Sequence, residues 1–200
     1  SGLPSVALRP CSGLPSVAGF NLVIGLFIGG SNKKYELTAE ITQRVITGLK
    51  EASAEMGADI LATTSRRTPR EIDALLKSEL KGYPKCGLLI IANEMNFPEA
   101  VGGILGLADF AVVSGESISM VSEAATSGKQ VLVFRLKKLC PRAKKTKHEM
   151  FLENLEKQGF IHIVEPENIA QKIKDIFIKR PPVRKLNDGI LVREAVKKLI

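Results

Sequence analysis

The chain has 200 residues, of which 44% are hydrophobic, enough to bury the core of one domain. Aromatic residues make up only 5% and Trp is absent, whereas aliphatic residues are plentiful. That balance is typical of a parallel sheet buried on both faces. No apolar run approaches the ~20 residues that cross a bilayer, and the first residues do not have the pattern of a signal peptide.

The cysteines and histidines do not indicate a metal centre. Cys11, Cys86 and Cys140 are scattered and form no CxxC pair. An odd, dispersed set argues against a disulfide framework or a zinc site and fits a reducing compartment, so we expect a cytoplasmic protein. We expect ordinary surface or strand positions for His148 and His162.

The formal net charge of +8 indicates an anionic partner without identifying it. Basic residues follow one another without an intervening acid at Lys137, Lys138, Arg142, Lys144, Lys145 and Lys147. A solvated loop is one interpretation of this run. An acidic membrane surface, with the protein peripheral to it, or a phosphorylated acceptor is the other. Nucleic acid fits least well, because no aromatic side chains are interleaved to stack on bases.

The N-terminal residues 1–20 contain the heptapeptide SGLPSVA twice and are rich in Gly, Pro and Ser. We interpret them as a linker or disordered lead-in, followed by a folded domain over 21–180. Pro181 and Pro182 then separate a tail, 181–200, with a last short helix from about Asp188 to Ile200.

Short aliphatic runs alternate with amphipathic segments along the domain. We expect strands at Leu22–Ile28, Ile60–Thr63, Gly87–Ala92, Phe110–Val113, Val131–Leu136 and Ile161–Val164. Helices are expected over 37–56, from 68 onward, and over 96–107, 117–127, 149–158 and 168–178. Gly57 is a natural end for the first helix, and Thr68 to Glu71 matches a capping box with Pro at the first helical position.

Strands that alternate with helices of this length predict right-handed βαβ crossovers. The expected fold class is α/β, a Rossmann-like open parallel sheet of about six strands with helices on both faces. Such sheets bind ligands beyond the carboxyl ends of their strands, so the informative residues are those that directly follow each strand.

The first such junction is Gly29 to Tyr35. Gly29 and Gly30 allow a tight turn and the close approach of a ligand. Ser31 can donate a hydrogen bond, and Lys33 or Lys34 can meet negative charge.

The second junction is Ser65 to Pro69, where Arg66 and Arg67 precede the start of a helix. A helix N-terminus beside guanidinium groups suits a diphosphate, because both favour anions and Arg binds phosphate in a bidentate way. The alternative is that both arginines are merely solvated.

The third junction is Ser114 to Lys129, a Gly turn and a helix start rich in hydroxyl groups. Glu123 follows a turn or two into this helix, and a carboxylate there suits the vicinal hydroxyls of a ribose. An ordinary exposed helix position is the alternative for Glu123.

Several catalytic signatures are absent from the sequence: GxGxxG, the P-loop lysine motif, HExxH and a Ser/His/Asp set with a usable histidine. No pair of carboxylates has acid–base spacing. The sequence therefore indicates a binding apparatus and leaves the catalytic residues unknown.

Four blocks carry a resemblance to a known family: Ile28–Thr38, Thr63–Pro69, Gly103–Asp109 and Ser114–Val131. In this order they resemble the elongated-mitochondria, or mitochondrial fission, family over about residues 22–136. Its members are described as glycosyltransferases with the two-domain GT-B fold, and older descriptions call them nucleoside-diphosphate-sugar epimerases. The resemblance implies that this chain is the C-terminal, donor-binding half and that its partners are a nucleotide sugar and an N-terminal GT-B domain.

The last block is also similar to the donor-site stretch of the peptidoglycan N-acetylglucosaminyltransferase. By that resemblance Glu123 holds the donor ribose. Arg66 and Arg67 match the paired arginines of the mitochondrial fission family, which implies that they neutralise the leaving diphosphate. GT-B enzymes generally need no bound metal, so neither metal nor cofactor is implied, and the nucleotide-diphosphate sugar is a substrate. The predicted donor-site residues are Gly29, Gly30, Ser31, Lys34, Ser65, Arg66, Arg67, Thr68, Ser114, Gly115, Ser117, Ser119, Met120, Ser122 and Glu123.

Two positions depart from the family pattern. Gln130 replaces the proline of Gly-Lys-Pro, and Asn96-Phe97-Pro98 stands where many members have Asn-Pro-Tyr, which leaves the role of that loop open. Two other functions also stay open: a sugar-nucleotide epimerase, and a non-catalytic interaction module related to mitochondrial fission proteins.

Overall fold

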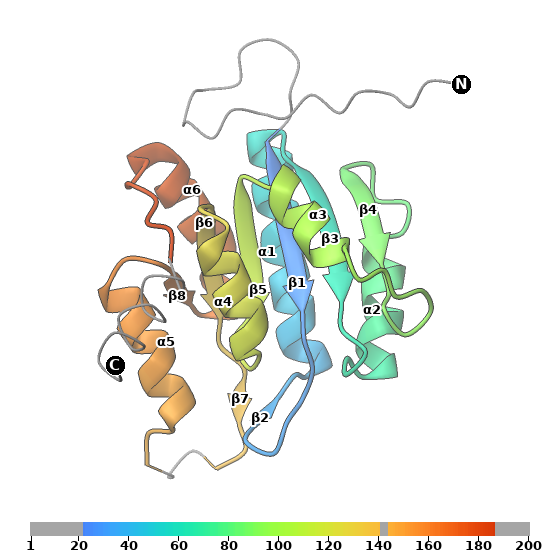
Figure 1. The fold of residues 1–200 in the computed structure, drawn as a ribbon. Helices are drawn as coiled ribbons and strands as arrows, with labels where there is room; N and C mark the ends of the chain where they lie inside the picture. The colour runs from blue at the N-terminus through green and yellow to red at the C-terminus, as the bar shows by residue number, and fades with distance from the viewer. Residues whose placement is uncertain (1–21, 141–143, 187–200) are drawn as a thin grey trace.

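The computed structural model describes residues 22–140 and 144–186. Its centre is a six-stranded sheet in which every pairing is parallel, with strand order β4-β3-β1-β5-β6-β8 (Figure 1). The strands are β1 (Val23–Ile28), β3 (Asp59–Thr64), β4 (Cys86–Ile90), β5 (Phe110–Ser114), β6 (Gln130–Phe134) and β8 (His162–Val164). The predicted α/β class and the parallel sheet of six strands are confirmed.

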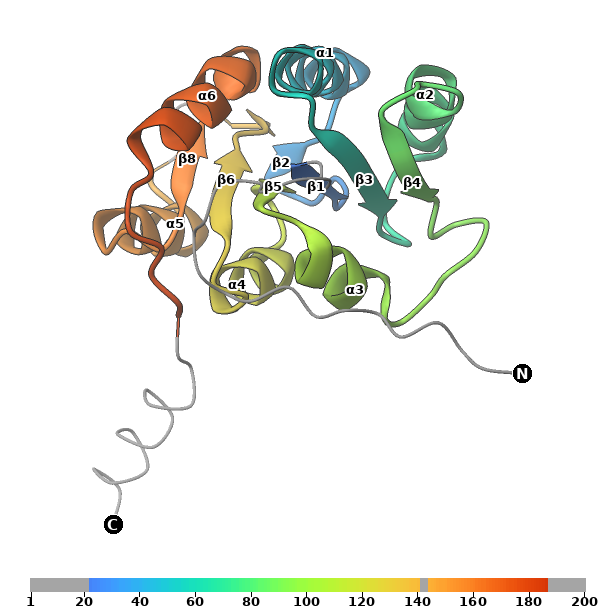
Figure 2. The ribbon, with the colours of Figure 1, turned by 90° about the horizontal axis from the view of Figure 1, so that it is seen from above.

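Helices cover both faces of this sheet (Figure 2). One face packs against α1 (Ala39–Met56), α2 (Arg70–Leu80) and α6 (Ile169–Lys179), which follows the 3-10 turn η1 (Pro166–Asn168). The other face packs against α3 (Ala100–Leu107), α4 (Ile118–Thr126) and α5 (Lys147–Lys157). The two apolar clusters between these layers form the core.

The central strand β1 shows why the sequence builds two layers. All six of its residues are buried. Ile24 and Leu26 belong to the apolar cluster under α1, and Phe27 points to the opposite cluster, as the two-residue period of a strand requires. Gly25 faces α3, where an added Cβ would lie 3.0 Å from the Ile104 side chain. The missing side chain therefore lets α3 lie close to the sheet.

The predicted end of α1 is confirmed, whereas the helix begins two residues later than predicted, at Ala39. The Thr38 hydroxyl accepts a hydrogen bond from the Ile41 N–H at 3.2 Å, which satisfies one free donor of the first turn. At the other end Gly57 adopts a left-handed conformation with φ of 65°. This is the usual helix-ending role of glycine.

The predicted capping box at Thr68 is wrong. The N-cap of α2 is Pro69, which has no side-chain capping bond. The Thr68 hydroxyl instead donates to the Gly29 carbonyl and accepts from the Ser65 N–H, so it holds two loops together. A capping box forms at Thr146 and Glu149, at the start of α5, where none was predicted.

A small second sheet was also not predicted. The two-residue strands β2 (Tyr35–Glu36) and β7 (Lys137–Lys138) pair antiparallel at the carboxyl end of the main sheet. Part of the basic run is therefore a strand rather than a loop. No helix in the described part of the chain is both long and apolar enough to cross a membrane.

The two ends of the chain were predicted as a lead-in over 1–20 and a helix over 188–200, and both lie outside the described residues. Residues 181–186 are described and pack on the domain. Leu186 is buried against the α4 layer, and its N–H donates to the Ala125 carbonyl.

The left-handed Gly57 gives a first prediction. We expect Gly57→Ala to lower the free energy of unfolding by about 1–2 kcal/mol, because a Cβ is unfavourable at positive φ even though nothing lies within 4 Å of it. Urea denaturation of both proteins measures the change. The matched control is Gly102→Ala in α3, where the space is also open but φ is helical. The control should leave stability unchanged or raise it by about 0.5–1 kcal/mol. An equal effect of both substitutions would contradict the account.

Candidate functional site

The strand order fixes where a ligand site is expected. The chain runs outward from β1 to β3 and β4, and then returns to β5 on the other side of β1. Loops therefore diverge beyond the carboxyl ends of β1 and β5, and this switch point is the usual ligand crevice of such sheets. The loops after β1, β3 and β5 contain most of the predicted site residues.

The turn after β1 is held by side chains from the loop after β5. The Gly29 N–H donates to Ser114 Oγ at 2.7 Å, and the Gly30 N–H donates to Glu116 Oε1 at 2.6 Å. Ser114 and Glu116 are both buried. The two amide groups that were predicted to approach a ligand are thus already bonded within the protein.

The two glycines are required by packing within the protein. A Cβ on Gly29 would overlap Glu116 Oε1, and a Cβ on Gly30 would overlap the Arg67 backbone carbonyl. Only a residue without a side chain lets these groups come so close. The loops after β1, β3 and β5 are consequently locked to one another.

The loop after β3 is also fixed from the side of β4. The Asn93 amide donates to the Thr68 carbonyl at 2.9 Å and to Asp73 Oδ2 at 2.6 Å. Asp73 is buried in the first turn of α2. These bonds hold the loop after β4 beside Ser65 to Thr68.

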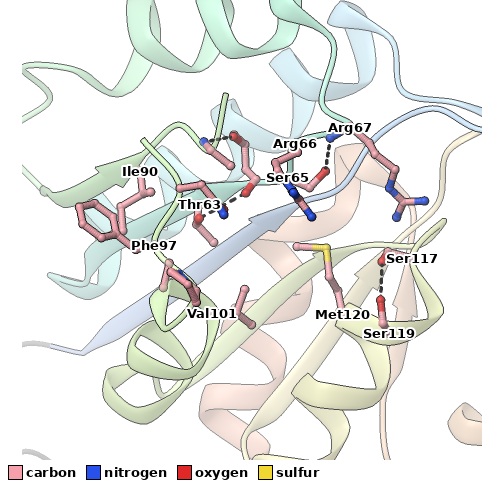
Figure 3. Close-up of a pocket in the computed structure, with 15 residues that line it drawn as sticks. Thr63, Ser65, Arg66, Arg67, Ile90, Phe97, Val101, Ser117, Ser119 and Met120 are labelled. Carbon is pink, nitrogen blue, oxygen red and sulfur yellow. Dashed lines mark hydrogen bonds between the residues drawn. The ribbon is translucent and has the colours of Figure 1, made fainter. Parts of the chain in front are cut away.

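A pocket of about 220 Å³ opens between these loops (Figure 3). Its lining comes from the end of β3 and its loop, from the end of β4 and its loop, and from the starts of α3 and α4. The lining residues are Thr63, Thr64, Ser65, Arg66, Arg67, Ile90, Ala92, Asn96, Phe97, Pro98, Ala100, Val101, Ser117, Ser119 and Met120. Sites that enclose a drug-sized ligand measure roughly 300–1,000 Å³, so this pocket covers only part of a nucleotide sugar.

Six of the predicted site residues line this pocket: Ser65, Arg66, Arg67, Ser117, Ser119 and Met120. In Figure 3 Arg66 extends toward Met120, and Arg67 extends toward Ser117. Both arginines are exposed, and neither forms an ion pair with the described residues. Ser117 is the N-cap of α4 but makes no capping bond, which leaves the first N–H groups of that helix without a side-chain acceptor. Cationic groups and a helix N-terminus thus meet at one pocket.

The other predicted residues fall into two groups. The first group is buried and fixes the loops that form the pocket: Gly29, Gly30, Thr68 and Ser114. The second group is at least partly exposed but does not line the pocket: Ser31, Lys34, Gly115, Ser122 and Glu123. Glu123 is exposed one turn after Ser119 on the same side of α4, so it lies beside the pocket rather than within it.

Glu116 is the main residue that sequence reasoning missed. Burial raises the pKa of its carboxyl group above 4.5, whereas the Gly30 N–H, Ser114 and the charge of Arg67 partly oppose that shift. Its second oxygen, Oε2, has no hydrogen-bond partner among the described residues. The hydrogen-bond partner of Glu116 is the Gly30 N–H, 86 positions away in the sequence, so no local pattern could have identified Glu116.

His148 was also expected to be an ordinary residue. It lies on α5 with Nε2 at 2.6 Å from the Gly115 carbonyl, and its ring contacts the Tyr35 ring edge to face. Burial lowers the pKa of His148 from 6.5, which favours the neutral ring. A neutral imidazole with Nε2–H donating to Gly115 supports the turn after β5.

The basic run is partly neutralised within the chain. Lys137, Lys138 and Lys145 form ion pairs with Glu36, Glu149 and Glu153 respectively. Lys144 and Lys147 are exposed. Arg142 lies outside the described residues. The described part of the run therefore offers less free positive charge than its sequence indicates.

Comparisons with known proteins place the chain in a family and give a solved structure of similar fold. An uncharacterised protein of Rickettsia prowazekii (strain Madrid E) is 27% identical over 176 residues, which is 81% of this chain and 47% of that protein. The chain thus spans about half the length of its curated relative. A crystal structure assigned to a UDP-N-acetylglucosamine 2-epimerase from Listeria monocytogenes superposes with a TM-score of 0.54 at 16% identity, covering 78% of this chain and 37% of that one.

At 16% identity the Listeria structure shows a common fold and no more. That common fold agrees with the Rossmann-like sheet described above. The family model described as Mitochondrial fission ELM1 matches residues 21–196, nearly the whole chain. The chain therefore belongs to the mitochondrial fission ELM1 family.

Proposed function

We propose that this chain is the donor-binding half of a GT-B glycosyltransferase, which holds a nucleotide-diphosphate sugar for transfer to an acceptor. The observation that carries the proposal is the meeting of Arg66, Arg67 and the uncapped start of α4 at one pocket. Such an arrangement favours a diphosphate, because guanidinium groups and helix N–H groups both stabilise anions. The same groups would stabilise the nucleotide diphosphate as it leaves.

The rest of the pocket suits a nucleoside. Phe97 is 48% exposed at the pocket wall and can stack on a base, and Asn96 beside it offers an amide that can both donate and accept. Glu123, one turn beyond Ser119, is within reach of a ribose that extends along α4. This placement orders the ligand from base to sugar across the loop after β4 and the start of α4.

The lining favours binding over an independent reaction centre. No Asp, Glu, His or Cys is among the residues that line the pocket in the described part of the chain. An epimerase would need acid–base groups at the sugar, so this half fits transfer better, with the acceptor and its base supplied by a second domain. The modest volume of the pocket also fits a ligand held between two domains.

Nucleotide titration tests the proposal. The chain is titrated by calorimetry with UDP, GDP, ADP and CMP without metal, and the same titration is made on a protein that carries both domains. We expect saturable binding of a nucleoside diphosphate and weaker binding of CMP, because the diphosphate supplies the contacts to Arg66 and α4. Failure of every nucleotide to bind even the two-domain protein would refute a donor site and favour a non-catalytic interaction module.

Arg66→Ala should weaken nucleoside-diphosphate binding roughly 10- to 100-fold, since a hydrogen bond to a charged group contributes about 1.5–3 kcal/mol. The matched control is Arg44→Ala, which removes the same charge from an exposed position on α1, on the opposite face of the sheet. We expect the control to bind as the wild type does. Equal losses in both variants would mean that only net charge matters.

Glu123→Ala should weaken binding of a nucleoside diphosphate but not of inorganic pyrophosphate, because the predicted role of the carboxylate is to hold the ribose hydroxyls. Calorimetric titration of both ligands measures the difference. The matched control is Glu71→Ala, which removes another exposed carboxylate from the first turn of α2. Unchanged nucleotide affinity in Glu123→Ala would remove this residue from the site.

A further inference from the structure

The turn after β1 is the place where many nucleotide-binding sheets hold a phosphate on backbone N–H groups. In this chain both N–H groups of the turn are already engaged. Ser114 Oγ accepts from Gly29, and Glu116 Oε1 accepts from Gly30, with donor–acceptor distances of 2.7 and 2.6 Å. An oxygen of a buried carboxyl group thus stands where a phosphate oxygen would otherwise be bound.

The arrangement is closed to solvent. Glu116 is 6% exposed and Ser114 is fully buried, so a ligand cannot reach the Gly30 N–H without moving the Glu116 side chain. The contact of Glu116 with the Cα of Gly29 is so tight that a Cβ there would overlap Oε1. The carboxyl group therefore fills the space above the turn as well as bonding to it.

We propose that Glu116 is a specificity-determining residue that closes the turn after β1 to phosphate and confines the ligand's diphosphate to the pocket beside Arg66, Arg67 and α4. The diphosphate itself rests on the proposed function. The closure of the turn rests only on the two hydrogen bonds, the burial and the steric contact. A carboxyl group suits this role because it presents an oxygen acceptor to the amide and, when ionised, repels a second anion.

The surroundings hold Glu116 in place. Arg67, from the loop after β3, contributes a positive charge that favours the ionised form of Glu116. Ser114, from the end of β5, bonds to the turn after β1 by accepting from the Gly29 N–H. His148, from α5, fixes the neighbouring Gly115 carbonyl at 2.6 Å. The turn after β5 is therefore anchored on both sides of Glu116, and the side chain is kept over Gly30.

The test follows the backbone amide signals by NMR while inorganic pyrophosphate is added. In the wild type we expect the signals of Ser119 and Met120 to move and the Gly30 signal to stay. In Glu116→Ala the Gly30 N–H is free, so we expect its signal to move as pyrophosphate binds. The apparent affinity for pyrophosphate obtained from this signal should be at least about tenfold higher than that from any Gly30 response in the wild type. Glu116→Gln is the matched control, since its amide oxygen still accepts from Gly30 and should keep the turn closed.

The outcomes separate this inference from the proposed function. Movement of the Gly30 signal in the wild type, or no response in a folded Glu116→Ala, would overturn the closure. Pyrophosphate could also leave the Ser119 and Met120 signals unchanged in the wild type but move the Gly30 signal in Glu116→Ala. That result would refute the donor site and leave the closure of the turn intact. Should Glu116→Ala not fold, Glu116→Ser removes the same carboxyl group but keeps a polar side chain, and the Gly30 signal should then respond to pyrophosphate. An unchanged Gly30 signal in folded Glu116→Ser would count equally against the inference.

Discussion

The structure depends on the turn between β1 and β2, at Gly29 and Gly30. Two other segments of the chain bond to this turn: in the loop after β5, Ser114 and Glu116 accept from its two N–H groups, and in the loop after β3 the Thr68 hydroxyl donates to its Gly29 carbonyl. Each of these bonds is buried, where an unmet polar group would be costly. The loops beyond three neighbouring strands are therefore fixed relative to one another before any ligand arrives.

This rigidity explains how the pocket is presented. Because both N–H groups of the turn after β1 are already bonded, the donors that face the pocket are the guanidinium groups of Arg66 and Arg67 and the first turn of α4. These donors lie on one side of the switch point. Asn93 and Asp73 hold the loop after β4 at the far wall, so Phe97 and the cationic groups face the same space. A preformed wall of this kind would lower the entropic cost of holding the nucleotide sugar that we propose as the ligand. In the same proposal, a second domain supplies the opposite wall.

Much of the fold could be predicted from the sequence because its determinants are local. The aliphatic period of β1 and the left-handed Gly57 at the end of α1 depend on neighbouring residues. The positions of Arg66, Ser117 and Ser119 in one pocket could also be predicted, since carboxyl ends of parallel strands meet at one edge.

The hydrogen bonds that fix the loops of the site could not be predicted in the same way. Glu116 and Thr68 act through bonds to Gly30 and Gly29 across 86 and 39 positions, and a long-range bond from a side chain to the backbone has no sequence period. Thr68 matched a capping box, but in the structure its hydroxyl donates to the Gly29 carbonyl and accepts from the Ser65 N–H instead. Competition of this kind between local and tertiary partners is decided only in the folded chain.

The central claim is that the pocket between the loop after β3, the loop after β4 and the start of α4 binds a nucleoside diphosphate. A crystal structure of the chain with the tightest-binding nucleoside diphosphate tests it most directly. We predict the base beside Phe97, the diphosphate between Arg66 and the first turn of α4, and the Glu116 carboxyl group still on the Gly30 N–H. A nucleotide bound instead on the basic surface of β7 and α5, or at the Gly29–Gly30 turn with Glu116 displaced, would contradict the account.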